Sequence, residues 1–495
     1  MAQRSRRTKA VIEYGDFQTP LVLARSAVKL LARLGFRPHS VLEPTCGRGT
    51  FVAAVAEVFS DATTIIGVDI NKGYLASAFE AFGKEYPRIR LICGDFFDFN
   101  WESVVTPALA PWLIVGNPPW VTSSALSAIE SVNVPAKSNF YGRLGIEAIT
   151  GKSNFDISEW MLLRYLDWLQ HTGGVIAVLC KTIVARKILQ HVWKSRAFGV
   201  YSASAYKFDT ARYFDATVDA CLFILELRPD AISTHCDFYE NFESGLPTYS
   251  LGYSKGHVVS DIVAFNKHAE LFGRDERITW RSGIKHDCSK VMELRAVPGG
   301  FENGLGEYVH MEDALLYPLL KSSDVGNGRV NSRNVMLVTQ DHIGADTNWI
   351  RHEWPQTWEY LTGHAGLLNK RASVIYKNRP VFSIFGVGSY AFAPWKVAIS
   401  GFYKKLEFLQ VGPENGKPVV FDDTVYFLPC VSADQATFLA RLLRSEVAQS
   451  FLGSMIHWDD KRPITIDVLK RLSLEKLAAF LGESSAFRRL MIDTS

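Results

Sequence analysis

The chain contains 495 residues, 47% of them hydrophobic, which is enough for more than one domain with a buried core. Its seven cysteines include no Cys-x-x-Cys pair, so they indicate neither a disulfide scaffold nor a zinc site. The basic first residues precede no apolar segment, and no apolar run is long enough to span a membrane. We therefore expect a cytoplasmic protein without a metal site. With a net charge of +3, nucleic-acid binding would need clustered rather than global positive charge.

The first predicted strand, residues 41–42, leads through a glycine-containing turn into a helical pattern over residues 52–59. A glycine-rich turn between a strand and a helix lets the backbone approach a ligand closely. Glu43 opens this turn, and the third glycine of a dinucleotide-binding fingerprint is absent. The turn is therefore a candidate ligand-binding loop, but not a complete dinucleotide fingerprint.

Two further predicted strands end in groups suited to a nucleoside. Residues 64–69 end in Asp69, about twenty residues beyond the turn, where ribose hydroxyls are usually bound. Residues 89–93 are followed by Asp95, suited to accept from an adenine amino group, and by Phe96, suited to cover the ring. Taken singly, Asp95 is more often a loop cap and Phe96 more often a core residue. The strength of the pattern lies in its repetition at successive strand ends.

The fourth predicted strand carries the most informative motif. The apolar run over residues 111–116 stops at Asn117-Pro118-Pro119-Trp120, because proline cannot continue a strand ladder. Ligands of open α/β sheets bind at the carboxyl ends of the strands. An amide, stiffened backbone carbonyls and an aromatic ring at that place suit a flat ring bearing an amino group. The simpler alternative is a proline-rich turn with an incidental tryptophan.

Together, these strand ends resemble the S-adenosylmethionine-dependent amino-methyltransferases, most closely the gamma-class N6-adenine DNA methyltransferases of restriction–modification systems. Residues 117–120 match the family's catalytic motif, Asn/Asp/Ser-Pro-Pro-aromatic. Residues 16–20 resemble its leading cofactor motif, and residues 43–51 its main cofactor loop. The order of cofactor motif, catalytic motif and recognition region is that of the gamma class. The resemblance implies S-adenosyl-L-methionine as the cofactor.

The resemblance also implies roles for individual residues. The catalytic residues would be Asn117, Pro118, Pro119 and Trp120. The cofactor-binding residues would be Thr19, Pro20, Glu43, Thr45, Cys46, Gly47, Gly49, Phe51, Asp69, Ile70, Asp95, Phe96 and Asn117. Trp120 and Phe214 would pack against the target base. The rivals of Phe214 for that role are Phe208 and Tyr213, and core packing is the alternative for all three.

The expected chemistry follows from an adenine substrate. Adenine N6 is a poor nucleophile because its lone pair is delocalised into the ring. If the Asn117 side-chain oxygen and the Pro118 carbonyl each accept one N6–H, the lone pair localises on nitrogen. Trp120 would stack on the base, and the methyl group would pass directly to N6 without a metal or a covalent enzyme intermediate. Because N6 is buried in duplex DNA, the base must be flipped out, which costs a few kcal/mol.

The implied fold is α/β, in two domains. Residues 1–235 would form a Rossmann-like methyltransferase domain around a mostly parallel seven-stranded sheet, and residues 236–495 an α+β target-recognition domain. The polar stretch over residues 229–247 indicates a linker. Segments of the second half that resemble family recognition domains are residues 281–290, 317–325, 390–405 and 440–446. Basic and aromatic residues interleaved in such loops suit phosphate contacts and base readout.

Three other functions use related features. An RNA adenine methyltransferase or a protein-glutamine methyltransferase would share the catalytic motif, but the long second half argues against both. A catalytically silent DNA-binding subunit would share the fold, but the intact motif argues against it. Since the cofactor motif begins at residue 16, no room is left upstream for a nuclease, and we expect any restriction endonuclease to be a separate protein. We expect a monomer that binds double-stranded DNA and no membrane.

Overall fold

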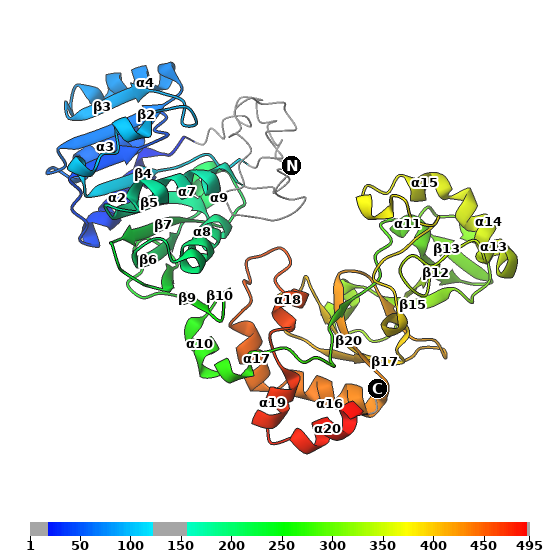
Figure 1. Cartoon of the computed structure of the whole chain (residues 1–495). Coiled ribbons are helices and arrows are strands. Elements are labelled where there is room, and N and C mark those ends of the chain that lie inside the picture. Colours follow the sequence, from blue (N-terminus) through cyan, green and yellow to red (C-terminus); the bar gives the residue numbers. More distant parts are fainter. Residues whose placement is uncertain (1–17, 122–155, 493–495) are drawn as a thin grey trace. The chain divides into compact units, whose positions relative to one another are not determined.

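The structure is a computed structural model that describes residues 18–121 and 156–492 (Figure 1). The chain divides into two compact units, Met1–Ile262 and Val263–Ser495, called unit 1 and unit 2 below. The boundary expected at residue 235 is therefore too early. Within the described ranges, no helix is long and apolar enough to cross a membrane.

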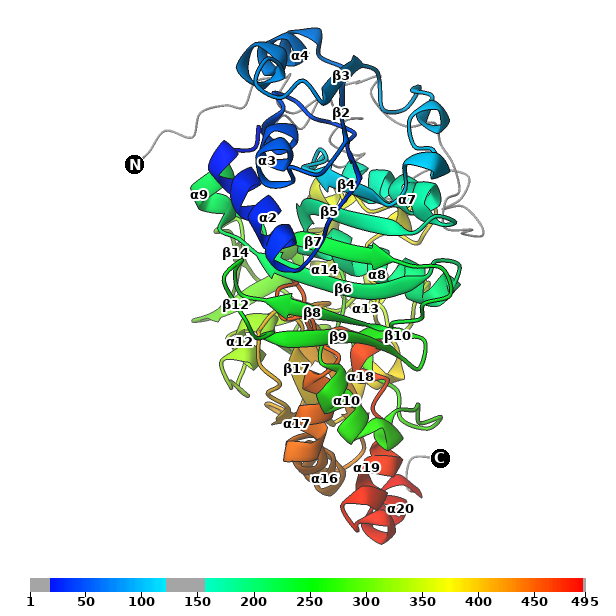
Figure 2. The ribbon, with the colours of Figure 1, turned by 90° about the vertical axis from the view of Figure 1, so that its left-hand side faces the viewer.

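Unit 1 is built on one ten-stranded sheet. Its strands are β1 (Ser40–Glu43), β2 (Thr64–Asp69), β3 (Ile89–Cys93), β4 (Trp112–Gly116), β5 (Gly174–Lys181), β6 (Val200–Lys207), β7 (Ala220–Leu227), β8 (His235–Tyr239), β9 (Tyr249–Ser254) and β10 (His257–Val259). Their order is β10-β9-β8-β6-β7-β5-β4-β1-β2-β3 (Figure 2). The adjacent strands β3, β2, β1, β4 and β5 run parallel, and β7 is antiparallel to both β5 and β6. Strands β1 to β7 form the expected Rossmann-like methyltransferase sheet.

Helices cover both faces of this sheet. They are α2 (Leu21–Arg33), α3 (Thr50–Val58), α4 (Lys72–Ala78), α7 (Ile157–Leu169), α8 (Thr182–Ser195) and α9 (Thr210–Phe214). Successive strand residues point to opposite faces, so each buried strand feeds two cores. Val41 packs in the core formed with α2 and α3, whereas Leu42 packs in the core formed with α7 and α8. This double burial explains the uninterrupted apolar runs of these strands.

Strands β8 to β10 extend the sheet beyond the seven strands expected. β8 pairs in parallel with β6, and β9 and β10 follow as antiparallel neighbours. The sequence suggested a linker here because most of these residues are polar. Cys236 and Phe238 alternate with those polar residues, and both are completely buried in the core of unit 1. Residues 235–259 are thus part of the sheet rather than a linker.

Unit 2 has the α+β composition that the sequence predicted. Its strands are β11 (Arg281–Ser282), β12 (Glu293–Val297), β13 (Gly300–Asn303), β14 (Tyr308–Val309), β15 (Leu316–Leu320), β16 (Asn334–Leu337), β17 (Trp395–Ser400), β18 (Leu409–Val411), β19 (Val420–Phe421) and β20 (Val425–Cys430). They form a four-stranded sheet, β11-β20-β17-β18, and a six-stranded sheet, β14-β13-β12-β16-β15-β19. Every pairing is antiparallel except that of β15 with β19. Over residues 263–492, no βαβ repeat organises unit 2.

The helices of unit 2 are mostly short. They are α10 (Ile262–Lys267, which begins at the last residue of unit 1), α11 (Ser289–Met292), α12 (Ser322–Gly326), α13 (Ile350–Glu353), α14 (Pro355–Gly363), α15 (Ala365–Asn369), α16 (Ala433–Leu443), α17 (Glu446–Gly453), α18 (Ile466–Leu469), α19 (Leu474–Phe480) and α20 (Ser484–Ile492). One hydrophobic core lies on the six-stranded sheet, and a second contains residues of both sheets.

Candidate active site

The predicted residues of unit 1 gather at one edge of its sheet. Because β3, β2, β1, β4 and β5 are parallel neighbours, the loops that follow them leave the sheet on the same side. The loop after β1 carries residues 44–49, and the loop after β4 carries residues 117–120. Asp69 ends β2 and is followed by Ile70, and Asp95 and Phe96 lie in the loop after β3. This is the edge at which open α/β sheets bind their ligands.

The cofactor loop turns tightly because two glycines adopt left-handed backbone angles. Gly47 has a φ of 52° and Gly49 a φ of 77°, which residues with a side chain rarely adopt. A Cβ atom on Gly47 would also lie 2.8 Å from Oε1 of Gln18. The Gly47 N–H donates to Oδ2 of Asp69 over 2.7 Å, and the Asn71 N–H donates to Oδ1 over 2.8 Å. The loop after β1 is thus tied to the carboxylate at the end of β2.

Glu43 links the cofactor loop to the catalytic motif. Its Oε2 accepts the N–H of Val52 over 3.1 Å, and a Cβ atom on Gly116 would lie 3.1 Å from its Cγ. Burial raises the pKa of the Glu43 carboxyl well above its usual range. The Val52 hydrogen bond opposes this rise in pKa, and the charge of Asp69 adds to it. A cation brought to this carboxyl would stabilise its ionised form.

The leading cofactor motif lies against the same loop. Oε1 of Gln18 accepts the N–H of Arg48 over 3.2 Å. Thr19 is buried, and Pro20 stands at the N-cap of α2 with an extended backbone. Residues 16–17 of this motif lie outside the described residues. Gln18 thus contacts the cofactor loop, and Thr19 and Pro20 follow it directly in the chain.

Other residues of the cofactor loop divide between the core and the surface. Cys46 is buried, and burial raises the pKa of its thiol well above the usual value, so it is not placed to act as a nucleophile. Phe51 is completely buried between α3 and the sheet, which gives its side chain a packing role. Thr45 is half-buried, and Ile70 remains 46% exposed at the end of β2. Ile70 therefore offers an apolar surface to a ligand.

Asp95 and Phe96, expected to bind adenine, make local contacts after β3. Oδ1 of Asp95 accepts the N–H of Phe97 over 2.9 Å and stabilises its own turn. The ring of Phe96 is only 6% exposed and lies in an aromatic cluster, 5.1 Å from the ring of Trp101 and 5.9 Å from that of Trp168. This placement favours core packing for Phe96, the alternative noted from its sequence.

The catalytic motif follows β4 directly. Asn117 and Pro119 are half-buried, and Pro118 and Trp120 are buried. Nε1 of Trp120 donates to the carbonyl oxygen of Leu179 in β5 over 3.2 Å. The motif is therefore held against the neighbouring parallel strand rather than left as a free loop.

The aromatic residues proposed for the target base lie together. The rings of Trp120 and Phe214 are 5.4 Å apart in an edge-to-face arrangement. Phe208 is 6.4 Å from Trp120, and Tyr213 is 6.5 Å from Phe208. Phe214 is the last residue of α9. Of the three candidates, Phe214 makes the closest ring contact with the catalytic motif among the described residues.

Sequence reasoning missed two charged residues beside the motif. Nζ of Lys181 lies 3.3 Å from the carbonyl oxygen of Trp120 and 2.5 Å from Oδ2 of Asp156. Lys181 is the charged last residue of an apolar strand, as Asp69 is in β2. This position at a strand end was the sequence signal that could have identified Lys181. No group of three or more His, Cys, Asp or Glu residues is arranged to hold a metal ion in the described part of the chain.

Three of the recognition-like segments of unit 2 converge. From residues 281–290, Arg281 lies with its guanidinium 4.5 Å from the ring centre of Tyr390, in the third segment. The hydroxyls of Ser322 and Ser400, from the second and third segments, lie 2.6 Å apart. From the fourth segment, Arg444 donates to the carbonyl oxygen of Phe408, just beyond the third segment.

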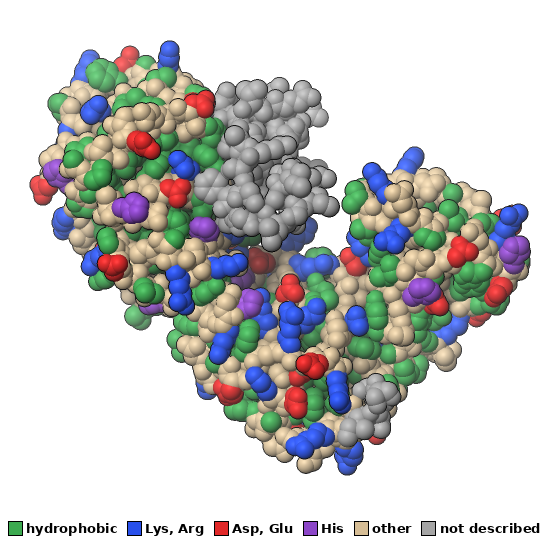
Figure 3. All heavy atoms as spheres, in the orientation of Figure 1, with side chains coloured by type: hydrophobic (Ala, Val, Ile, Leu, Met, Phe, Trp, Pro, Cys, Tyr) green, Lys and Arg blue, Asp and Glu red, His purple; other side chains and the backbone are tan. Residues whose placement is uncertain are grey.

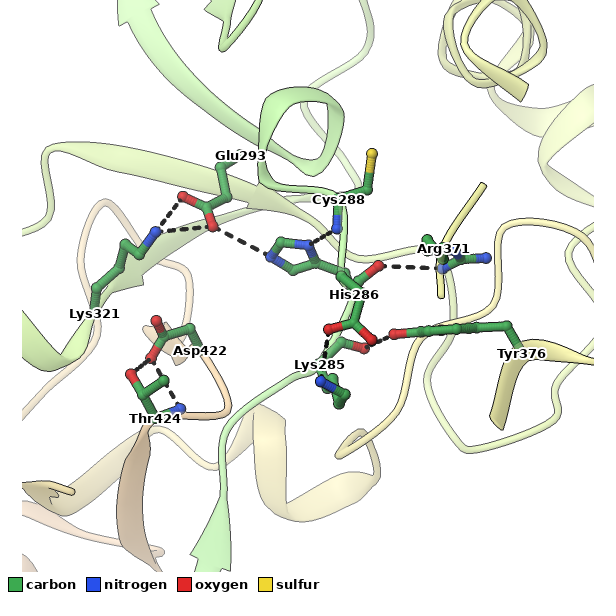
Figure 4. Close-up of polar contacts among 10 residues, drawn as sticks. Lys285, His286, Cys288, Glu293, Lys321, Arg371, Tyr376, Asp422 and Thr424 are labelled. Carbon is green, nitrogen blue, oxygen red and sulfur yellow. Dashed lines mark hydrogen bonds and ion pairs between the residues drawn. The ribbon is translucent and has the colours of Figure 1, made fainter. Parts of the chain in front are cut away.

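A buried polar network occupies this junction (Figure 4). Lys321 donates to both oxygens of Glu293 over 3.0 and 2.9 Å, and Nε2 of His286 lies 3.4 Å from the same carboxylate. Burial alone would raise the pKa of Glu293, but the contacts with His286 and Lys321 bring it below its usual value. Arg371 donates to the carbonyl oxygen of His286 over 3.3 Å. His286 of the first segment and Lys321 of the second are thus joined through Glu293.

Lys396, which lies in the third of these segments, is only 1% exposed. Its ammonium donates to the carbonyl oxygens of Ala393 and Val419, each over 2.7 Å. Burial lowers the pKa of Lys396 to about 7. Its side chain is therefore part of the core rather than of a surface that contacts phosphate. On the face shown in Figure 3, basic and acidic side chains are interspersed.

This burial predicts a pH dependence of stability. The pKa of Lys396 is lower in the folded protein than in the unfolded chain. The buried ammonium therefore lowers the free energy of unfolding by its full amount below about pH 7, and this effect is relieved as the pH rises towards 10.5. We expect Lys396→Met to remove a rise in unfolding free energy on the order of 1 kcal/mol per pH unit between pH 7 and 9. Urea unfolding at several pH values measures this slope, with the exposed Lys404→Met as control. An unchanged slope in Lys396→Met would contradict the assignment.

Comparison with known proteins identifies the family. No family model matches the chain. It is, however, 46% identical over 474 residues to the type II methyltransferase M.NspV of Nostoc sp., an alignment that covers 95% of this chain and 98% of that protein. The chain belongs to the type II methyltransferases. S-adenosyl-L-methionine is the cofactor of this type II methyltransferase.

A solved structure shares the fold of this type II methyltransferase. The type IIL restriction–modification enzyme MmeI, in complex with DNA, aligns with 91% of the chain at 12% identity and a TM-score of 0.54. The methyltransferase spans 64% of the MmeI chain. The likeness includes both units, so the combination of a Rossmann-like unit and a second α+β unit is common to the two proteins.

The strand-end residues of the type II methyltransferase fit its cofactor. The backbone N–H groups of the cofactor loop and the Asp69 carboxylate suit a nucleoside, and the exposed Ile70 suits the face of its ring. The buried Glu43 carboxyl is complementary to an amino group. These are residues of different loops, brought together only by the parallel sheet.

Proposed function

We propose that this type II methyltransferase transfers a methyl group from S-adenosylmethionine to N6 of adenine within a specific sequence of duplex DNA. The observation that carries the proposal is the place of Asn117-Pro118-Pro119-Trp120 at the carboxyl end of β4. There it adjoins Glu43 and the loop tied to Asp69. The same edge thus holds amino-group acceptors and a nucleoside-binding carboxylate, which is what a methyl transfer between two adenine-bearing groups requires.

In the proposed mechanism, Oδ1 of Asn117 and the carbonyl oxygen of Pro118 accept the two N6–H groups. Accepting both hydrogens draws the nitrogen towards tetrahedral geometry and localises its lone pair. The two prolines have no backbone N–H to rearrange and restrict the turn, so these acceptors are set in place before the base arrives. The bound cofactor supplies an electrophilic sulfonium methyl group.

The target base would reach these acceptors by leaving the DNA stack. In the proposed complex the base stacks on the Trp120 ring, and Phe214 packs edge-on beside that ring. Stacking on an aromatic ring offsets part of the few kcal/mol needed to extrude a base. Phe208 then supports Phe214 rather than replaces it, since its ring lies farther from Trp120, and Tyr213 packs against Phe208.

Unit 2 would select the DNA sequence. Sequence is read by contacts to base edges, which need a rigid frame that presents loops to the grooves. The network of Lys321, Glu293 and His286 supplies such a frame. MmeI, whose fold covers both units, is a restriction–modification enzyme solved in complex with DNA, which supports the same assignment here. We further propose a cytoplasmic monomer whose partner endonuclease is a separate protein.

The product distinguishes this function from its alternatives. Duplex DNA, RNA and protein extract are each incubated with tritiated S-adenosylmethionine, and the labelled DNA is digested to nucleosides. We expect label in N6-methyladenine from DNA alone, confined to one sequence by single-molecule sequencing. Label in RNA or in protein would support the corresponding alternative, and label in another DNA base would overturn the adenine assignment.

Asp69 provides a prediction for the cofactor site. Asp69→Ala removes a charge-assisted acceptor for ribose hydroxyls, so S-adenosylmethionine should bind more weakly by roughly 1–3 kcal/mol. Calorimetry measures this loss. DNA affinity without cofactor should change little. The control is Asp61→Ala, which removes an acid before the opposite end of the same strand. If Asp69→Ala instead lost DNA binding and kept cofactor affinity, the strand-end assignment would be wrong.

A further inference from the structure

The end of β5 holds Trp120 at two points. The carbonyl oxygen of Leu179 accepts the indole N–H over 3.2 Å, and Nζ of Lys181 donates to the Trp120 carbonyl oxygen over 3.3 Å. One bond fixes the ring and the other fixes the backbone. Since Trp120 follows Pro119, these contacts also limit how far the proposed acceptors on Asn117 and Pro118 can move.

Lys181 has a second partner, at the start of α7. Its Nζ lies 2.5 Å from Oδ2 of Asp156, the N-cap residue of α7. Oδ1 of Asp156 accepts both the N–H and the hydroxyl of Ser158, over 3.1 and 2.6 Å. The ion pair therefore attaches Lys181 to a helix whose first turn is already fixed.

The same helix is bonded to the residue after the motif. The N–H of Ile157 donates to the carbonyl oxygen of Val121 over 2.8 Å. Lys181 links Trp120 to Asp156, and the backbone bond links Val121 to Ile157. The end of the catalytic motif is thus joined to the start of α7 by one charged side chain, at the end of β5, and by one backbone hydrogen bond.

The burial of the pair makes it strong enough to position a loop. The side chains of Lys181 and Asp156 are 20% and 6% exposed, so solvent screens them less than a surface pair. Removing the ammonium would leave the Asp156 carboxylate nearly buried without its cation. Nearby, Lys187 and Glu159 also join α8 to α7 over 2.5 Å. Among the described residues, no hydrogen bond or ion pair joins Lys187 to residues 117–120. That pair is a control built into the structure.

We propose that Lys181 is a positioning residue for methyl transfer: its ammonium, held by Asp156, fixes the Trp120 backbone and through it the acceptors of the catalytic motif. The inference rests on the proposed function of that motif. A misplacement of about 1 Å at a reacting group lowers turnover by up to about 100-fold. Cofactor binding relies on other loops of the sheet edge, so it is unaffected.

The test compares Lys181→Met, Lys181→Arg and Lys187→Met in the full-length enzyme. Calorimetry with S-adenosylmethionine shows that each preparation is folded. We expect Lys181→Met to lower kcat about 10- to 100-fold with the cofactor Kd unchanged. Lys181→Arg, which can donate to both acceptors, should recover kcat to within about five-fold of wild type. Lys187→Met should keep the wild-type kcat, although it also breaks a buried-carboxylate ion pair.

Asp156→Asn provides a second route to the same answer. The amide still caps α7 but no longer holds the ammonium by charge, so kcat should fall without a change in cofactor Kd. Wild-type kcat in Lys181→Met, an equal loss in Lys187→Met, or loss of cofactor binding in both Lys181→Met and Asp156→Asn would overturn the inference. Because kcat is measured on whichever base the wild type methylates, a product other than N6-methyladenine would refute the proposed function and leave this test intact.

Discussion

An Asn117→Ala enzyme is expected to bind S-adenosylmethionine within a few-fold of wild type and to lose nearly all methyl transfer to DNA. The substitution removes the side-chain oxygen proposed to accept one N6–H, so the lone pair of N6 stays delocalised. Loss of one preorganised hydrogen-bond partner typically lowers kcat by about 10²- to 10³-fold. Tritium transfer measures catalysis, and calorimetry measures cofactor binding on the same preparation.

Asn117→Asp is the matched control. It keeps an oxygen acceptor of the same length, and the family motif itself accepts Asp at this position, so part of the activity should survive. Asn117→Ala with near wild-type transfer would refute the mechanism. If both variants lost cofactor affinity to the same extent, Asn117 would be a cofactor residue rather than an acceptor for the target amine.

The strand ends of unit 1 were predictable because each rule there is local. β2 and β3 have the predicted bounds, since an apolar run closed by a polar residue marks both the strand and its end. Gly47 could be read as a close-approach position, and its φ of 52° agrees. Parallel packing then brings together residues as distant as Glu43 and Gly116, which the fold class alone implies.

Burial at individual positions was not predictable from the same patterns. Phe96 follows a strand end as a ligand-covering ring would, yet neighbouring aromatic rings enclose it. Lys396 stands in a segment with basic and aromatic residues, yet its ammonium finds two backbone carbonyls inside the core. Lys181 acts through contacts 61 and 25 residues away in sequence. Such contacts depend on tertiary packing, which composition and spacing do not specify.

The division of labour between the units predicts the behaviour of two fragments. A fragment ending at residue 262 keeps the complete ten-stranded sheet and the described residues of the proposed active site. It should fold, bind S-adenosylmethionine with near wild-type affinity and lose sequence-selective methylation, because it lacks the unit proposed to contact base edges. Calorimetry and single-molecule sequencing of treated DNA measure the two properties.

A fragment ending at residue 235 should behave differently, although it too keeps the proposed catalytic residues. It loses most of β8 and all of β9 and β10, which exposes the edge of β6 and removes Cys236, Phe238 and Leu251, all completely buried, from the core. Burying one large apolar side chain contributes about 1.5–3 kcal/mol, so their loss approaches the 5–15 kcal/mol of a typical domain. We expect aggregation or a much lower unfolding temperature. Equal stability of the two fragments would contradict the structural role of these strands, whereas selective methylation by the longer fragment would refute the assignment of recognition to unit 2.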